Sequence, residues 1–204
     1  LIYKQEFEQM ISGKFHNTKL KLINKTVVLS DAKITPLFSP KDKVITTNII
    51  PLIDKAKNYV YIPAFIITHD ELSNALIRAH KRNVTVKIIV DATNALNARS
   101  KVKLLRQAGI PVKIENYAGK VHSKSIIIDD KYLIAGSMNF SNSGENRNDE
   151  NCLIIDSKRF AKYYREFFEY LWAKIPDKYL TQYVRAEGKD SIGSCFDGID
   201  NNYD

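Results

Sequence analysis

The chain has 204 residues and a net charge of +8, with 44% apolar and 26% charged residues, the composition of a globular domain with a sizeable hydrophobic core. No run approaches the roughly 18 uninterrupted apolar residues of a membrane-spanning helix, and the two cysteines, Cys152 and Cys195, show neither a disulfide framework nor zinc-ligand spacing. These properties argue against a membrane-spanning chain and against a disulfide-rich scaffold.

Short β-type runs alternate with helical patterns along the first half of the chain. Runs rich in Val, Ile, Tyr and Phe predict strands over 26–29, 33–38, 58–65, 84–90 and 110–114. Periodic apolar residues predict helices over 47–57, 68–82 and 102–108, with a loop over 91–100. Pro51 lies early in the first helix, and Thr68 and Glu71 have the spacing of a capping box at the start of the second.

The second half continues with a β-hairpin and a long helix. Strands over 121–128 and 132–135 flank a turn, and a polar loop over 141–151 precedes a strand over 152–155. Asp156 or Ser157 can cap the last helix. Its i, i+3, i+4, i+7, i+8, i+11 spacing predicts a core-facing stripe of Phe160, Tyr163, Tyr164, Phe167, Phe168 and Leu171. The alternation as a whole predicts an α/β fold, a mixed β-sheet flanked by helices on both faces.

The sequence divides into three parts. We expect an N-terminal extension over residues 1–30, a main domain over residues 31–186 and an acidic tail over residues 187–204. The tail ends on Asp200-x-Asn202-x-Asp204, the opening spacing of an Asp-rich calcium loop. The glycine and the later acidic residue of such a loop do not follow, so a floppy acidic tail is favoured over a structural calcium site.

His122 and Lys124 are the centre of the predicted reactive site. Successive side chains in a strand alternate between its faces, so these two point the same way. Lysine is costly to bury without an anion, and Gly136-Ser137-x-Asn139 ends the next predicted strand nearby. An imidazole can be a nucleophile or an acid-base group near neutral pH, while the ammonium, hydroxyl and amide can hold phosphate oxygens. This combination predicts a phosphoryl-transfer pocket without a metal.

A nucleophilic histidine also needs its second ring nitrogen held by another group. Either Glu150 or Asp149, at the end of the polar loop, could hold it, and their positions favour neither. The other histidines, His16, His69 and His80, are interpreted as structural residues.

These residues carry a resemblance to a known family. His122-x-Lys124-x4-Asp129, then Gly136-Ser137-x-Asn139, then Asn148-x-Glu150-Asn, resemble the signature of the phospholipase D superfamily. The surrounding segments, from about Pro36 to Trp172, resemble its small bacterial endonucleases with one motif per chain. The resemblance implies that residues 31–186 are a phospholipase D-like catalytic domain, and that residues 1–30 and the tail lie outside it.

The resemblance also implies roles for the site residues. His122 would be the nucleophile that forms a phosphohistidine, and Glu150 would orient it. Lys124, Ser137 and Asn139 would hold the phosphate, whereas Asp129, seven residues from His122, is expected to fix the hairpin turn, and Gly136 belongs to the motif as a structural residue. Hydrolysis needs a second acid-base group, which the family supplies by pairing two motifs, so this short chain is expected to form a homodimer with both His122 side chains at one cleft.

The motif recognises the phosphodiester and leaves its substituents open. Residues 187–204 hold one lysine against five acidic residues, so residues 1–186 carry +12, which suits a polyanion. A solvated lysine-rich surface explains the same charge. We therefore expect a metal-independent endonuclease on single-stranded DNA or RNA, because a narrow cleft with two histidines closes around one backbone. The basic residues near the site in sequence are Arg99, Lys101, Lys103, Lys113 and Lys120, and Arg99, Lys101, Lys103 and Lys120 are expected to line the substrate groove.

Two rival functions stay open at this point. One is a lipid phosphodiesterase or transphosphatidylase of the same fold, although residues 31–186 show no interfacial amphipathic helix. The other is a catalytically idle nucleic-acid-binding module, against which the complete set of site residues argues. The resemblance to exported nucleases favours the bacterial envelope, the periplasm or the exterior. Because the sequence begins at Leu1 and not at methionine, a signal peptide or a membrane anchor ahead of it is also an open expectation.

Overall fold

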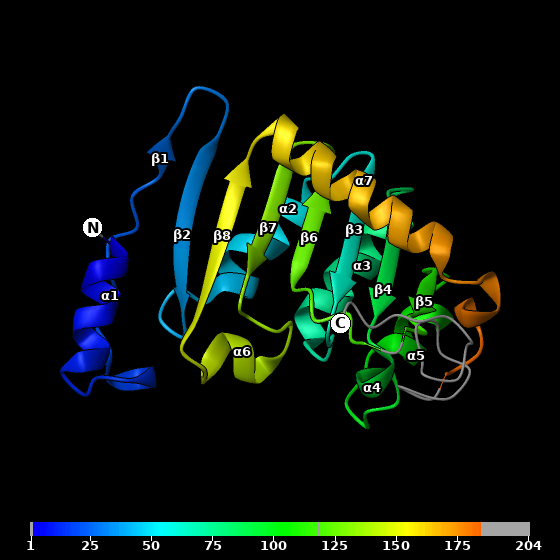
Figure 1. Ribbon diagram of the computed structural model, residues 1–204, viewed down its shortest axis with the longest axis horizontal. Helices are drawn as coiled ribbons and strands as arrows, with labels where there is room; N and C mark the ends of the chain where they lie inside the picture. Colours follow the sequence, from blue (N-terminus) through cyan, green and yellow to red (C-terminus); the bar gives the residue numbers. More distant parts are fainter. Residues whose placement is uncertain (1, 118, 185–204) are drawn as a thin grey trace, which may run out of the picture.

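The chain folds around one mixed β-sheet (Figure 1). The structure is a computed structural model that describes residues 2–117 and 119–184, so the tail residues Asp200, Asn202 and Asp204 lie outside the described residues. The strand order is β1-β2-β8-β7-β6-β3-β4-β5. Strands β3, β4 and β5 pair in parallel, and the other neighbours pair antiparallel. The strands are β1 (Val27–Val28), β2 (Lys33–Ser39), β3 (Tyr59–Ala64), β4 (Thr85–Val90), β5 (Val112–Ile114), β6 (Ser125–Ile128), β7 (Tyr132–Gly136) and β8 (Glu150–Asp156).

Helices cover both faces of this sheet. The long helix α7 crosses one face over β8, β7, β6 and β3, whereas α2, α3 and α5 lie on the other (Figure 1). The predicted α/β fold with helices on both faces is therefore confirmed. The helices are α1 (Ile2–Ile11), α2 (Ile50–Asp54), α3 (Asp70–Lys81), α4 (Ala92–Ala95), α5 (Val102–Gln107), α6 (Asn142–Asn146) and α7 (Lys158–Lys174), with short 3-10 helices at His16–Thr18 and Asp177–Leu180 and a π-helix at Val44–Ile49.

The pleat of the central strands divides the apolar side chains between two cores. In β3, Val60 and Ile62 point into the larger core under α2 and α3, and Tyr61 points into the smaller core under α7. The ring of Tyr61 stacks on Phe168 of α7, with the centroids 4.8 Å apart. Both faces of the central sheet are thus buried, which explains why its strands read as nearly continuous apolar runs.

Several helix boundaries differ from the sequence prediction. Helix α3 is capped by His69 and not by Thr68, because His69 Nδ1 accepts a hydrogen bond from the Leu72 N–H, while the N–H groups of Thr68 and His69 both donate to the Phe140 carbonyl. The predicted loop over 91–100 contains α4, capped by the Asp91 carboxylate. The predicted polar loop over 141–151 contains α6 and the first residues of β8.

The aromatic stripe of α7 is rotated relative to the prediction. Phe168 is fully buried, but Tyr163 and Phe167 are more than half exposed. Ala161 faces the sheet instead, and Arg165 pairs with Asp130 in the hairpin turn at 2.7 Å. A small residue and a paired cation therefore occupy positions on the inner face, and part of the aromatic set lies on the outer face.

The N-terminal extension is part of the folded body. Its residues Val27 and Val28 form the edge strand of the sheet, paired with β2. Helix α1 packs against the same edge, where the ring of Tyr3 meets Phe38 edge to face at 5.0 Å. The N-terminal extension is expected to lie outside the main domain, but its residues Val27 and Val28 contribute an edge strand to the sheet of that domain.

Candidate active site

Sheet topology brings the predicted site residues to one edge. Strand β6 runs antiparallel to both β3 and β7, and β7 runs antiparallel to β8. The end of β3, the start of β6, the end of β7 and the start of β8 consequently lie side by side. His122 and Lys124 precede β6, Ser137 and Asn139 follow β7, and Glu150 begins β8.

His122 and Lys124 lie on the same side of the chain, around one aromatic ring. The predicted strand over 121–128 begins only at Ser125, so both residues belong to an extended segment in front of it, where Lys124 forms an isolated bridge with Ala64. The His122 ring packs edge to face on Phe65, with the centroids 4.5 Å apart, and Lys124 Nζ lies 5.3 Å from the same ring. The shared face expected from strand alternation is present.

The imidazole of His122 is exposed and accessible to a ligand. Neither ring nitrogen makes a hydrogen bond within the described chain, and the backbone N–H donates to the Lys120 carbonyl at 3.0 Å. Lys124 Nζ donates to the His122 carbonyl at 2.9 Å. Burial lowers the pKa of Lys124, and the negative charge of Glu150 opposes this shift. The ammonium and the Glu150 carboxylate thus act on one another across the site.

Ser137 and Glu150 are joined directly. Ser137 Oγ donates to Glu150 Oε2 at 2.5 Å and accepts from the Asn151 N–H at 3.1 Å, while Asn148 Nδ2 donates to Glu150 Oε1 at 3.1 Å. The expected hydrogen bond from the His122 ring to Glu150 is not formed between the described residues, and the Glu150 carboxylate accepts from Ser137 and Asn148 instead. Asn139 Oδ1 is buried and has no hydrogen-bond partner within the described chain, so this atom stays available to bind a ligand.

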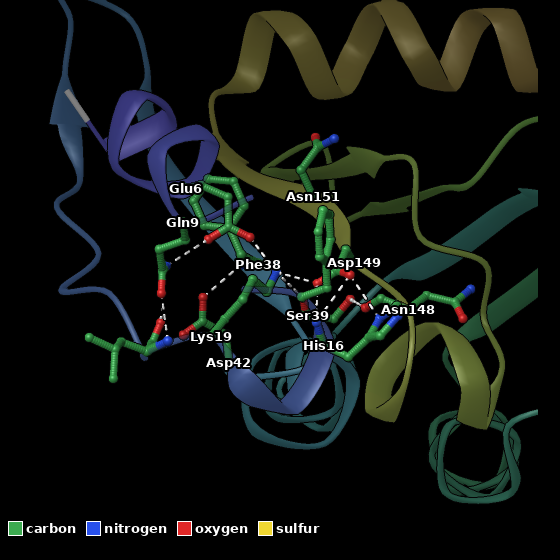
Figure 2. Close-up of polar contacts among 12 residues, drawn as sticks. Glu6, Gln9, His16, Lys19, Phe38, Ser39, Asp42, Asn148, Asp149 and Asn151 are labelled. Carbon is green, nitrogen blue, oxygen red and sulfur yellow. Dashed lines mark hydrogen bonds and ion pairs between the residues drawn. The ribbon is translucent and has the colours of Figure 1, made fainter. Parts of the chain in front are cut away.

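Asp149, the other candidate partner of His122, faces the N-terminal segment. Its carboxylate accepts from the His16 backbone N–H at 2.9 Å, pairs with His16 Nδ1 at 2.8 Å and pairs with Lys19 Nζ at 2.7 Å. Figure 2 shows these contacts together with those of Lys19 to Glu6 and to the Ser39 carbonyl. The alternative in which Asp149 holds the His122 ring is therefore wrong. The Asp149 side chain contacts the N-terminal segment, whereas the Glu150 side chain contacts Ser137 in the candidate site.

Asp129 and Gly136 each have a structural role in the backbone of the sheet. Asp129 lies at the far end of β6 from His122, with a φ of 55°, and its carboxylate accepts three hydrogen bonds of 2.7–2.8 Å from the backbone N–H groups of Lys57, Asn58 and Tyr59. It ties the hairpin turn to the start of β3. A Cβ at Gly136 would lie 2.2 Å from the Asn151 carbonyl oxygen, so only glycine allows β7 to approach β8 here.

The basic residues near the site in sequence do not form one groove. Lys113, near the site in sequence, is buried and donates to the Trp172 and Ile175 carbonyls at 2.8 and 2.6 Å. Lys101 pairs with Asp70, and Lys103 lines a separate hollow with Arg106 and Tyr183. Arg99 is exposed at the end of the α4 segment. Of this basic set, Lys120 lines the same shallow hollow as His122, together with Phe167.

Two features of the site were missed in the sequence. Phe65 follows β3 directly and reads as one more apolar strand residue, although its ring positions His122 and Lys124. Lys19 reads as an ordinary surface lysine, but its side chain is 1% exposed. No local pattern marks either residue, because their partners lie far away in the sequence. Within residues 2–117 and 119–184, no group of three or more His, Cys, Asp or Glu side chains is arranged to hold a metal ion.

Comparisons with known proteins find relatives over most of the chain. The family described as "Cardiolipin synthase, PLD-like domain" matches residues 49–172. A phospholipase D of Rickettsia prowazekii is 34% identical over 160 residues, which cover 78% of this chain and 78% of that protein. The human mitochondrial cardiolipin hydrolase is 32% identical over 131 residues, 64% of this chain and 51% of that protein.

A solved structure has the same arrangement of elements. The crystal structure of Nuc, a phospholipase D family member from Salmonella typhimurium, superimposes with a TM-score of 0.63 and 27% identity. The superposition covers 72% of this chain and 97% of Nuc. The family match over residues 49–172 spans every residue of the site described above, from His122 to Glu150.

Proposed function

Because this chain belongs to the phospholipase D superfamily and is a phosphodiesterase, we propose that it is a metal-independent endonuclease acting on single-stranded DNA or RNA through a phosphohistidine at His122. The observation that carries the proposal is the meeting of His122, Lys124, Ser137, Asn139 and Glu150 at one sheet edge. An exposed imidazole stands there beside an ammonium, a hydroxyl and an amide, a set of groups that can carry out phosphoryl transfer.

In the proposed reaction, an imidazole nitrogen of His122 attacks the phosphorus of the diester. The bond from phosphorus to the leaving oxygen breaks, and Lys124 and Asn139 bind the phosphate oxygens on which charge collects. Water then attacks the phosphohistidine and releases His122. Glu150 takes part as a positioning residue, because its contacts with Ser137 and Asn148 and its charge near Lys124 fix the groups that meet the phosphate.

The second acid-base group is proposed to come from another copy of the chain. A leaving alkoxide needs a proton, and the attacking water must give one up. Two of the other histidines are engaged elsewhere, His16 with Asp149 and His69 with Glu145, at 2.8 and 2.9 Å, and the third, His80, lies in the last turn of α3. A homodimer that joins two His122 side chains at one cleft supplies the missing group. The exposed aromatic residues of α7 beside the His122 hollow support this face as the contact.

The charge of the chain supports a nucleic acid as the substrate. Residues 1–186 carry +12, and phosphate backbones release counterions when such a surface binds them. A lipid phosphodiester is the second candidate, and the names of the Rickettsia and human relatives favour it. Both substrates present the same group to His122, so the site residues and the chemistry are shared by the two proposals.

Gel-resolved cleavage of labelled single-stranded DNA and RNA in EDTA tests the proposal. Wild type should cut at least one polymer, and His122→Ala should lose at least about a thousandfold in rate, as expected when a nucleophile is removed. Glu115→Gln, which alters a carboxylate outside the site, is the control for handling and folding. Release of headgroups from phosphatidylcholine or cardiolipin vesicles without nucleic-acid cleavage would identify the lipid candidate, and loss of all activity in EDTA would contradict the metal-free mechanism.

A further inference from the structure

The N-terminal segment, residues 2–29, exposes an unusual number of large apolar side chains. On α1 they follow one side of the helix, where Phe7 is 60% and Ile11 71% exposed. The extended segment after α1 continues the surface with Ile23, which is 84% exposed. The further members, each at least half exposed, are Leu20, Val27, Val28 and Leu29. Apolar residues gathered in this way mark an interaction surface, whereas isolated ones do not.

An apolar groove of about 790 Å³ runs through this surface, between α1, the extended segment and the exposed face of β2 and β8. Its walls come from sequence-distant elements, so it is a feature of the folded chain and not of α1 alone. The apolar side chains that line it are Ile2, Tyr3, Leu20, Leu22, Ile23, Val27, Ile34, Pro36 and Leu153. The groove is lined mostly by apolar side chains and is partly open to solvent, so it can receive an alkyl chain.

Lysines surround the apolar side chains. Residues 2–29 contain five lysines and two glutamates, and the pair of Lys19 with Glu6 is buried. The exposed charges are therefore four lysines against Glu8, and Lys21 and Lys25 lie directly on the wall of the groove. The exposed lysines are Lys4, Lys14, Lys21 and Lys25.

We propose that residues 2–29 form a docking surface for the face of a bilayer that contains anionic phospholipids. Exposed apolar side chains enter the boundary between headgroups and acyl chains, the groove receives an acyl chain, and the lysines bind lipid phosphates. The buried contacts of Lys19 with Asp149 and the Ser39 carbonyl fasten this surface to the domain, so the two dock as one body (Figure 2). No helix among the described residues is long and apolar enough to span a membrane.

A second copy of the chain is a poorer occupant of the same surface. A two-fold contact sets the same patch against itself, which would place the lysines of one copy opposite the lysines of the other. An anionic lipid face has the opposite charge and also supplies the alkyl chains that the groove fits. Charge and shape therefore favour the bilayer.

Vesicle sedimentation of the full 204-residue chain tests the proposal. The vesicles are pure phosphatidylcholine or an equimolar mixture with phosphatidylglycerol. Wild type should bind the mixture and not pure phosphatidylcholine. Ile11→Ser with Ile23→Ser should weaken binding at least about tenfold through lost apolar burial. Lys21→Glu with Lys25→Glu should do so by a similar factor through lost attraction to phosphate.

Leu96→Ser is the matched control, because Leu96 is 67% exposed but lies beside α4, toward the other end of the sheet. It should bind as wild type does, and thermal melting of each variant checks that the fold is kept. Equal binding by wild type and both double variants would overturn the proposal. If the isoleucine variant changes only the mass measured by light scattering and leaves vesicle binding unchanged, a second copy occupies the surface and the proposal is wrong. Because the readout is binding, its failure is separate from any failure of the nuclease assay.

Discussion

At the scale of single residues, two acidic side chains are buried together at the carboxyl ends of the parallel strands. Glu115 follows β5 and Asp91 follows β4, and both are buried. Burial is the main cause that raises the pKa of Glu115 to about 7, and the charge of Asp91 raises it further, while hydrogen bonds from the Ala92 and Tyr117 N–H groups oppose the shift. The folded chain therefore binds a proton at Glu115 under conditions where the unfolded chain has lost it.

This gives a pH dependence of stability with a definite sign. Between the ordinary pKa of 4.5 and the folded value of about 7, the folded state binds more protons at Glu115 than the unfolded state, so its stability decreases as the pH rises. The melting temperature of wild type should fall across this window. Glu115→Gln, which keeps a neutral hydrogen-bonding group, should melt with a flatter pH profile. Parallel profiles for the two proteins would contradict the role of Glu115.

Part of the candidate site can be predicted from the sequence pattern, whereas the choice of Glu150 over Asp149 rests on the resemblance to the phospholipase D superfamily. The sequence places the site residues next to predicted strand ends, and the sheet topology then brings these strand ends to one edge. The residues are His122, Lys124, Ser137, Asn139 and Glu150. The partners of the carboxylates could not be predicted. Which of two neighbouring acids faces the site depends on contacts with distant residues, and the sequence carries no local trace of them.

At the scale of elements, the N-terminal segment and β8 are held together by one buried lysine. Lys19 is surrounded by Glu6, Asp149 and the Ser39 carbonyl, and its side chain is 1% exposed. Asp149 directly precedes Glu150, whose side chain belongs to the candidate site. The segment outside the family match therefore supports the strand that carries a site residue.

Lys19→Met should lower the free energy of unfolding by about 3 kcal/mol, because it leaves two carboxylates largely buried without their cation. Urea unfolding measures this change. Lys4→Met is the control, since Lys4 forms an exposed pair with Glu8 at 3.6 Å and its loss should cost no more than about 1 kcal/mol. Equal effects of the two substitutions would show that the buried cluster contributes no more than a surface pair.

Strongly patterned elements could be predicted, and the short helices α4 and α6 could not. Strands β3 and β4 and helix α3 were predicted within one or two residues, whereas α1, α4 and α6 were not. The two short helices have four and five residues, too few for a period, and begin where side chains of Asp91 and Ser141 accept backbone hydrogen bonds. For α7, aromatic residues on the outer face extended the apparent stripe beyond the side that packs.

At the scale of the whole molecule, the proposed mechanism couples assembly to activity. Phe167 is 52% exposed on α7 and lines the hollow that contains His122. Phe167→Asp should convert the homodimer to a monomer in light scattering and abolish cleavage together with it, because a buried charge at the contact is costly. Leu104→Asp, on α5 at the other face of the sheet, should change neither. A fully active monomer of Phe167→Asp would contradict the two-histidine cleft.

The two outermost strands of the sheet are its shortest. Strand β1 has two residues and β5 has three, whereas the central strands have four to seven. Strand β1 pairs with only Lys33 and Ile34 of the seven-residue β2, so the rest of β2 needs other partners at this border. There the Phe38 N–H donates to the Asp42 carboxylate. A side chain of this chain thus occupies a backbone group that could otherwise pair with an added β-strand, which should slow amyloid-like stacking at this border.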